Sequence, residues 1–142
     1  MIRRFTLATL FVVLSFFNLS LVQAADESET EPQAIVSLYH VAPGKHHDFL
    51  KWMEAREAIA KSQGIAATQW YMHWSGDSWD FMAISPVTTD EQNQKLDDAA
   101  KAKGMTGGMA AGMELRTMMM SHTDTWAGGP YTASELMKQM NE

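Results

Sequence analysis

The stretch of the chain that decides the fold is residues 67–85, ATQWYMHWSGDSWDFMAIS. It contains two runs rich in aromatic and aliphatic residues, 67–74 and 79–85, which have the composition of β-strands. The four residues between them, Ser-Gly-Asp-Ser at 75–78, are turn formers, and a connection of this length is typical of a β-hairpin. The stretch therefore predicts two neighbouring antiparallel strands.

Both faces of this predicted hairpin are apolar. In its second strand, Phe81 and Ala83 alternate with Met82 and Ile84. Alternate side chains of a strand point to opposite faces, and a sheet that helices cover on one side only normally shows polar residues on its open side. We therefore expect the open side to be buried against a second copy of the chain, in a homodimer with two-fold symmetry.

Further elements are predicted on both sides of the hairpin. A run rich in β-branched and aromatic residues, 34–41, precedes a segment, 45–62, in which apolar residues recur at helical spacing. After the hairpin, Thr88 and Glu91 have the spacing of a capping box, which marks the start of a helix that runs to about residue 103. The remaining predicted elements are a helix over 109–121 after a glycine-rich segment, a strand over 122–127 and a last short helix over 135–140.

The order of these elements is strand, helix, hairpin, one or two helices, strand. It corresponds to a split β-α-β arrangement, in which a four-stranded antiparallel sheet carries helices on one face. The sequence therefore predicts a ferredoxin-like α+β fold. No repeat and no linker interrupts residues 34–142, which are expected to form a single domain.

The first residues have the three-part form of a secretory signal peptide. Two arginines at positions 3 and 4 precede an uncharged run, 5–21, and Val-Gln-Ala at 22–24 places small or apolar residues where signal peptidase reads them. The alternative is an uncleaved membrane anchor, although polar residues interrupt the run and about 17 residues are marginal for a ~30 Å hydrocarbon core. We expect a signal peptide over 1–24, a disordered acidic leader over 25–33 and a periplasmic protein with no membrane segment after cleavage.

Composition excludes several classes of function. The chain has no cysteine, which rules out disulfides, thiolate metal sites and a cysteine nucleophile. It has 17 acidic and 11 basic side chains, so it lacks the basic surface that nucleic-acid binding requires. The glycine-rich segment 104–112 lacks the lysine of a phosphate-binding loop, no serine lies in a nucleophile elbow, and the histidines are too dispersed for a zinc cluster.

The beginning of the predicted domain resembles a known superfamily. Residues 39–45, YHVAPGK, followed by Asp48-Phe49-Leu50, are similar to the strand–turn–helix opening of the dimeric α/β-barrel superfamily, which includes antibiotic-biosynthesis monooxygenases and EthD-like and NIPSNAP-like proteins. The resemblance implies two four-stranded sheets paired into a barrel, with a cleft for a small apolar or aromatic ligand between sheet and helices in each subunit. Some members oxygenate aromatic substrates with no metal and no prosthetic group, so no cofactor is expected. The asparagine that haem-degrading members carry on an early strand is absent.

A histidine beside a carboxylate is the clearest candidate for catalysis. His122 and Asp124 are two residues apart on a predicted strand, so they share a face, and such a pair can act as a general base. The alternative is a structural role for both side chains. The side chains that we expect to line a ligand cleft with this pair are His40, Trp70, His73 and Trp126.

Methionine suggests a different function. Met105, Met109 and Met113 repeat every four residues, and three more methionines occupy 118–120. Thioether sulfurs are soft ligands suited to Cu(I), but methionine also fills cores and forms adaptable binding surfaces. The leading prediction is a small-molecule-binding protein, with cofactor-independent oxygenation of an aromatic substrate as its enzymatic form. The alternative is a non-enzymatic periplasmic binding or stress module that handles copper through the methionine-rich segment.

Overall fold

The computed structural model describes residues 33–141. The strands are β1 (Gln33–Val41), β2 (Gln69–Met72), β3 (Phe81–Pro86) and β4 (Met119–Gly128). The helices are α1 (His46–Ser62), α2 (Asp90–Ala102), α3 (Gly108–Arg116) and α4 (Ala133–Gln139), and none of them has the length and apolarity needed to cross a membrane. The predicted signal peptide, 1–24, and the predicted leader as far as residue 32 lie outside the described residues.

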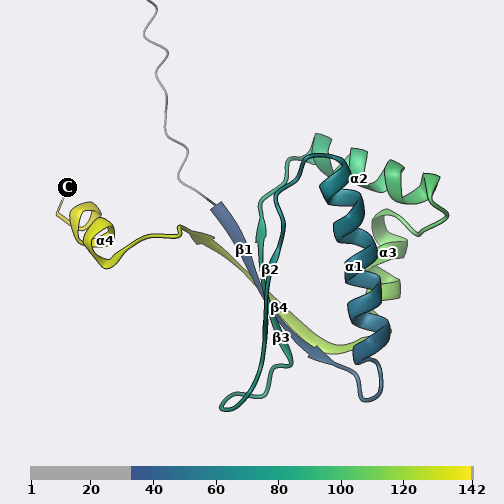
Figure 1. The fold of residues 1–142 in the computed structure, drawn as a ribbon, viewed down its shortest axis with the longest axis horizontal. Helices are drawn as coiled ribbons and strands as arrows, with labels where there is room; N and C mark the ends of the chain where they lie inside the picture. The colour runs from purple at the N-terminus through teal and green to yellow at the C-terminus, as the bar shows by residue number, and fades with distance from the viewer. Residues whose placement is uncertain (1–32, 142) are drawn as a thin grey trace, which may run out of the picture. The chain divides into compact units, whose positions relative to one another are not determined.

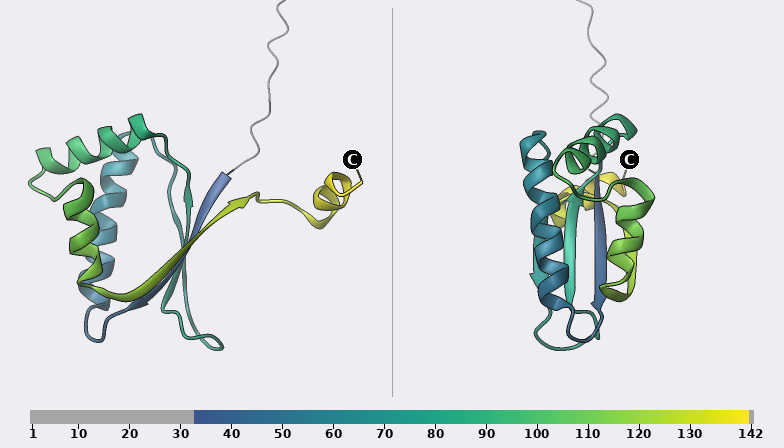
Figure 2. Two further views of the ribbon diagram at one scale, coloured as in Figure 1. Left: turned by 180° about the vertical axis from the view of Figure 1, so that it is seen from behind. Right: turned by 90° about the vertical axis from the view of Figure 1, so that its right-hand side faces the viewer.

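The four strands form one antiparallel sheet in the order β2-β3-β1-β4. β1 and β2 lie on either side of β3 and run parallel to each other, with α1 connecting them, which is the split β-α-β arrangement. Helices α1, α2 and α3 lie on one side of the sheet (Figure 1, Figure 2). The predicted ferredoxin-like α+β fold with a four-stranded antiparallel sheet is therefore confirmed.

The core lies between α1 and the sheet. Phe49 of α1 is fully buried and stacks on Phe81 of β3, with the ring centroids 5.7 Å apart and the ring planes 5° from parallel. Val41 and Met118 complete this buried cluster, and Trp52 packs against it. Because Phe49 and Trp52 are three residues apart, they lie on the same side of the helix, and their burial holds α1 against the sheet.

The opposite face of the sheet is not covered by α1, α2 or α3 (Figure 2), and it is apolar at its centre, with Thr123 and Thr125 of β4 beside the apolar part. The strand register places Val36 beside Ile84, Leu38 beside Met82 and Tyr71 beside Met82 on this face. Tyr71 is 46% exposed, and the other four side chains are partly exposed. We call these five residues the open face. The hairpin thus has the two apolar faces that its sequence predicts, and one of them is uncovered in the single chain.

The strands of the hairpin are shorter than predicted. The chain leaves the β2–β3 ladder after Met72, and residues 73–80 form a loop. The amide of His73 donates to the Asp80 carbonyl at 3.0 Å, and the amide of Asp80 donates to the Tyr39 carbonyl at 2.8 Å. Single hydrogen bonds, one of them to β1, therefore satisfy the backbone groups at the base of the loop. They replace the longer two-stranded ladder that the sequence predicts.

The start of α2 lies one residue later than predicted. The N-cap is Thr89, whose hydroxyl accepts a hydrogen bond from the Gln92 amide, while the Gln92 side chain accepts one from the Thr89 amide. The predicted box of Thr88 and Glu91 is therefore wrong by one position. The two boxes overlap in sequence, and local spacing alone does not distinguish them.

The end of α3 also differs from the prediction. The helix expected over 109–121 ends at Arg116, and Met119 already belongs to β4, where it pairs with Val41. Met118 and Met119 are both buried. Burial of these two side chains beside β1 therefore overrides the helical propensity of methionine in this segment.

Candidate functional site

Side chains of β1 and β4 form a polar cluster on the face of the sheet that α1 covers. The register pairs Ser37 with Asp124 and Tyr39 with His122, and residues two apart on a strand share a face. The Tyr39 ring lies 5.1 Å from that of Phe49 in α1, so this face is the one covered by helices. We call Ser37, Tyr39, His122 and Asp124 the polar cluster.

The Asp124 carboxylate connects the members of the polar cluster. Its Oδ1 accepts a hydrogen bond from Ser37 Oγ at 2.7 Å, and its Oδ2 lies 3.3 Å from His122 Nε2. Ser37 is 4% exposed, whereas the side chains of His122 and Asp124 are 31% and 47% exposed. A buried hydroxyl thus fixes one carboxylate oxygen, and the histidine bound to the other oxygen remains accessible to a ligand.

Tyr39 is the neutral member of the polar cluster. Burial raises the pKa of its phenol above the ordinary value of 10.0, a hydrogen bond with Ser37 acts in the opposite direction, and the nearby Asp124 carboxylate adds to the increase. Tyr39 therefore remains protonated near neutral pH, so it is not the proton acceptor of the cluster. His122 is the residue of the cluster whose type is suited to accepting a proton, and its Nε2 lies 3.3 Å from Asp124 Oδ2.

A row of aromatic rings extends from the polar cluster across the sheet. The rings of His122 and Tyr39 have centroids 6.0 Å apart at an interplanar angle of 14°, and those of Tyr39 and Trp70 are 5.9 Å apart at 28°. Trp70 also meets Phe49 and Phe81 edge-on, at 6.2 and 6.4 Å. These contacts fix the orientation of the rings. We call His122, Tyr39 and Trp70 the aromatic row.

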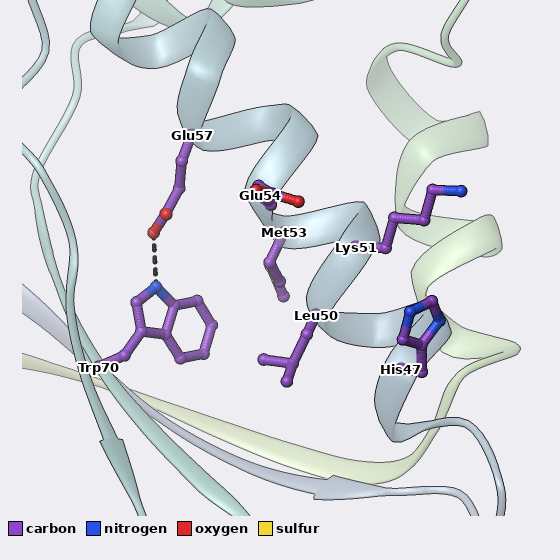
Figure 3. A pocket seen from close by; sticks show the side chains of 7 residues that line it. All are labelled: His47, Leu50, Lys51, Met53, Glu54, Glu57 and Trp70. Carbon is purple, nitrogen blue, oxygen red and sulfur yellow. Dashed lines mark hydrogen bonds between the residues drawn. The ribbon is translucent and has the colours of Figure 1, made fainter.

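The Trp70 end of the aromatic row lines a groove beside α1. The groove has a volume of about 610 Å³. The Trp70 indole donates a hydrogen bond from Nε1 to Glu57 Oε1 at 2.5 Å, which fixes the ring against the helix (Figure 3). Figure 3 shows the other side chains that line the groove, all from α1: His47, Leu50, Lys51, Met53 and Glu54. The groove therefore combines apolar side chains with charged groups, as small-molecule sites do.

A second hollow touches Trp70 from the side of α2. Its volume is about 410 Å³, and its polar lining includes Arg56, Asn93 and Asp97. Arg56 donates through Nη2 to the Thr106 carbonyl, and its guanidinium lies over the Trp52 ring at 4.5 Å. These contacts fix the position of the Arg56 side chain. The polar part of the hollow is therefore lined by one cation and several hydrogen-bond acceptors.

The structure brings together three of the six predicted site residues. His122 and Asp124 are in contact, and Trp70 lies at the far end of the aromatic row. Trp126 is on the same face, paired with Ile35 further along β4, and is 66% exposed.

The other two predicted site residues lie elsewhere. His40 alternates with Tyr39 along β1, so it belongs to the opposite face of the sheet and does not line a cleft with His122. His73 lies beyond the end of β2, with its ring 5.0 Å from that of Trp79. Its Nε2 is buried with no hydrogen-bond partner among the described residues.

Sequence reasoning missed three residues of the site: Ser37, Tyr39 and Glu57. A signal for the first two was present, because a serine inside an otherwise apolar strand is a buried polar group that needs a partner. Strand alternation also separates Ser37 and Tyr39 from His40. Glu57 carried no signal, since its i,i+4 spacing to Lys61 favours a solvent-exposed ion pair.

The methionines of the segment 105–120 do not form one group. Met118 and Met119 are buried, whereas Met109, Met113 and Met120 are 86%, 58% and 71% exposed. Copper binding by this segment remains a prediction that concerns the exposed members only. Among residues 33–141, no group of three or more histidine, aspartate or glutamate side chains is placed to hold a metal ion.

Comparison with known proteins yields similar folds. No protein-family model and no curated protein sequence matches the chain. A solved protein from Arabidopsis thaliana is 8% identical with a TM-score of 0.50, over 72% of this chain and 99% of that one. SnoaB, a cofactor-independent oxygenase from Streptomyces nogalater solved in a mutant form, is 14% identical with a TM-score of 0.49, over 72% and 97% of the two chains. A dimeric ferredoxin-like protein of unknown function from Thermobifida fusca is 8% identical with a TM-score of 0.47, over 70% and 92%.

These likenesses concern the fold alone. The sheet order of this chain by itself defines a ferredoxin-like α+β protein. Since a shared fold does not determine activity, function has to be argued from the polar cluster and the aromatic row.

Proposed function

We propose that this protein binds a small hydroxylated aromatic molecule against the aromatic row. The observation that carries this proposal is the row itself, in which Tyr39 stacks between His122 and Trp70 while Asp124 holds the histidine. Flat rings at fixed orientation favour a flat apolar ligand. A ligand bound at the His122 end of the row could donate a hydrogen bond from a phenolic hydroxyl to the histidine.

The enzymatic form of this proposal is oxygenation without a cofactor. His122 takes the proton of the bound phenol, and the Asp124 carboxylate stabilises the imidazolium that forms. The phenolate transfers one electron to O2, and the two radicals join in a carbon–oxygen bond. The peroxide anion takes the proton from the His122 imidazolium and becomes a hydroperoxide. His122 then removes the hydrogen of the same ring carbon, the O–O bond breaks, and the departing hydroxide takes that proton from His122, so that a phenol and O2 give a quinone and water.

Tryptophan fluorescence and oxygen consumption together test both levels of the proposal. We expect simple phenols, naphthols and hydroquinones to quench the fluorescence saturably, and at least one of them to drive O2 uptake. Replacing His122 by Gln is expected to lower the rate of uptake by about 100-fold or more while leaving quenching in place. His46→Gln is the matched control, because His46 lies outside the site and Gln keeps a group that can bind Asp80.

The outcomes separate binding from catalysis. Absence of saturable quenching by every compound would overturn the binding proposal. Quenching without O2 uptake would overturn the oxygenase and support the non-enzymatic binding module. Equal rates for the His122→Gln and unaltered chains would overturn the role of His122 as the base.

We also propose that two copies pair through the open face. None of its five residues is charged, and the chain carries 17 acidic against 11 basic side chains. Two molecules of the same net charge meet most favourably where neither presents a charge. The open face is therefore suited to a second copy of this chain and offers nothing for a partner of opposite charge.

We propose a periplasmic location for the dimer, on the form of residues 1–24 alone. Mass spectrometry of the protein from its own cells should show a chain that begins at Ala25. An intact chain that begins at Met1 would contradict this.

A further inference from the structure

The C-terminal arm, residues 129–141, leaves the domain in a defined direction. In Figure 1 and Figure 2, α4 stands beyond the end of β4 and away from α1, α2 and α3. Tyr131 packs against the end of β4, where a Cβ added to Gly128 would lie 3.1 Å from the tyrosine hydroxyl. A residue other than glycine would therefore crowd this contact, and Gly129 has a φ of 121°, which also favours glycine.

Helix α4 has a well-formed start and an unburied apolar side. The Thr132 hydroxyl accepts a hydrogen bond from the Glu135 amide, and the Glu135 carboxylate accepts one from the Thr132 amide, which completes a capping box. None of the residues of α4 is buried. Leu136 is 44% exposed, and the apolar residues beside it, Met137 and Met140, are 57% and 83% exposed.

A helix as short as α4 needs packing against another part of a protein to be stable. Isolated helices shorter than about 12–15 residues are marginal in water, and α4 has 7 residues. Its apolar side chains recur at positions 136, 137 and 140, which is the spacing of a buried helical stripe. The Tyr131 hydroxyl at the base of the arm is buried without a hydrogen-bond partner among the described residues, so a polar contact is missing there as well.

A second copy of this chain would cover both uncovered apolar surfaces, the open face and the apolar side of α4. The register places Thr125 of β4 beside Val36 and Ala127 beside Ala34, so the uncharged sheet surface continues along β4 to the point where the arm begins. An arm that starts at the rim of the open face and points away from its own helices is placed to reach a molecule seated on that face. In a two-fold dimer each chain would both give and receive such an arm.

We infer that the C-terminal arm is exchanged between two copies of the chain, with Leu136, Met137 and Met140 packed on the second copy beside the paired open faces. This inference rests on the proposed pairing of the open faces. It adds that the arm, and not the sheet alone, stabilises the dimer.

Two variants of α4 that carry the same added charge test the inference. Leu136→Glu places a carboxylate on the apolar stripe, and Ser134→Glu places one on the polar side of the first turn. By sedimentation equilibrium, we expect Leu136→Glu to raise the dimer dissociation constant by about tenfold or more, as for a buried interface side chain. Ser134→Glu is expected to leave it unchanged.

A paramagnetic label distinguishes exchange from folding back onto the same chain. The chain has no cysteine, so Lys138→Cys provides a single attachment site on the polar side of α4. The labelled chain is mixed with an isotope-labelled chain that carries no paramagnetic group. Exchange predicts broadened amide signals in the isotope-labelled chain, because the paramagnetic group on α4 of one chain then lies against the other chain.

Each outcome decides a different point. A monomeric unaltered chain would overturn the proposed pairing and the exchanged arm together. Equal dimer dissociation constants for Leu136→Glu and Ser134→Glu would overturn the exchanged arm alone. The absence of broadened amide signals in the mixed sample would do the same. Either result would leave the pairing of the open faces intact.

Discussion

At the scale of single residues, Asp80 shows how one carboxylate organises the end of the hairpin. Its Oδ2 accepts a hydrogen bond from the buried Val41 amide at 2.7 Å, and its Oδ1 lies 3.1 Å from His46 Nε2. Burial alone would raise the pKa of this carboxyl, but the hydrogen bonds from His46 and Val41 outweigh it and hold the pKa below the ordinary value of 3.8. The carboxylate is thus a fixed anchor between β1, the loop and the start of α1.

Removing this anchor should destabilise the fold in a pH-dependent way. We expect Asp80→Ala to lower the free energy of unfolding by about 1–3 kcal/mol at neutral pH, because the buried Val41 amide loses its acceptor. A carboxyl whose pKa is lowered by folding stabilises the protein above its ordinary pKa, and the contribution is lost as pH falls through the folded value. Urea unfolding should therefore show the two chains converging in stability as the pH is lowered below 3.8.

Asp77→Ala provides the control for this measurement. Asp77 lies in the same loop, but its carboxylate bonds only the adjacent Ser78 in an exposed position. We expect this substitution to change stability by no more than about 0.5 kcal/mol. A cost equal to that of Asp80→Ala would show that the loop as a whole, and not the bond to Val41, is responsible.

The candidate site shows what residue patterns can and cannot predict. The pairing of His122 with Asp124 follows from strand periodicity, because residues two apart must share a face whatever the rest of the fold does. The contact of Asp124 with Ser37 joins residues 87 positions apart and depends on the register of β1 with β4, which sequence spacing does not determine. The same register places His40, one residue from Tyr39, on the opposite face of the sheet from His122.

At the scale of elements, the start of α2 offers a direct test of capping. Thr89 accepts the Gln92 amide bond, whereas Thr88 donates its hydroxyl to the Asn93 side chain. We expect Thr89→Ala to cost about 1 kcal/mol of unfolding free energy, as the loss of an N-cap does. Thr88→Ala is the matched control, with an expected change within about 0.5 kcal/mol because its bond is exposed. Urea midpoints compare the two, and a larger cost for Thr88→Ala would contradict the observed cap.

Element types were predictable, but one element boundary depends on packing over a distance. The hairpin, α1 and β1 each follow from local composition and periodicity. The end of α3 does not, because methionine favours a helix and the run at 118–120 carries no local stop signal. Met118 leaves the helix since it is buried with Val41, Phe49 and Phe81, which is a property of the assembled core.

At the scale of the whole molecule, the two faces of the sheet differ in whether helices cover them. One face is closed by α1 through the Phe49–Phe81 stack, and the catalytic candidates lie at the margin of that core. The other face exposes apolar side chains and is continuous with the base of the arm. A single copy thus holds every residue of its proposed ligand site but leaves its open face uncovered, so ligand binding and stability are expected to depend on assembly to different degrees.

The dependence of stability on assembly gives the last prediction. If folding and pairing through the open face are coupled, the urea midpoint of the unaltered chain should rise with protein concentration, by the equivalent of about 2.7 kcal/mol per dimer over a hundredfold range. Ile84→Lys should abolish this dependence, because it places a charge within the open face. Ala102→Lys adds the same charge on α2, on the other side of the sheet, at an exposed position, and should leave the dependence intact. Midpoints from tryptophan fluorescence that are equal at all concentrations for the unaltered chain would show that the open face is not where the molecule gains its stability.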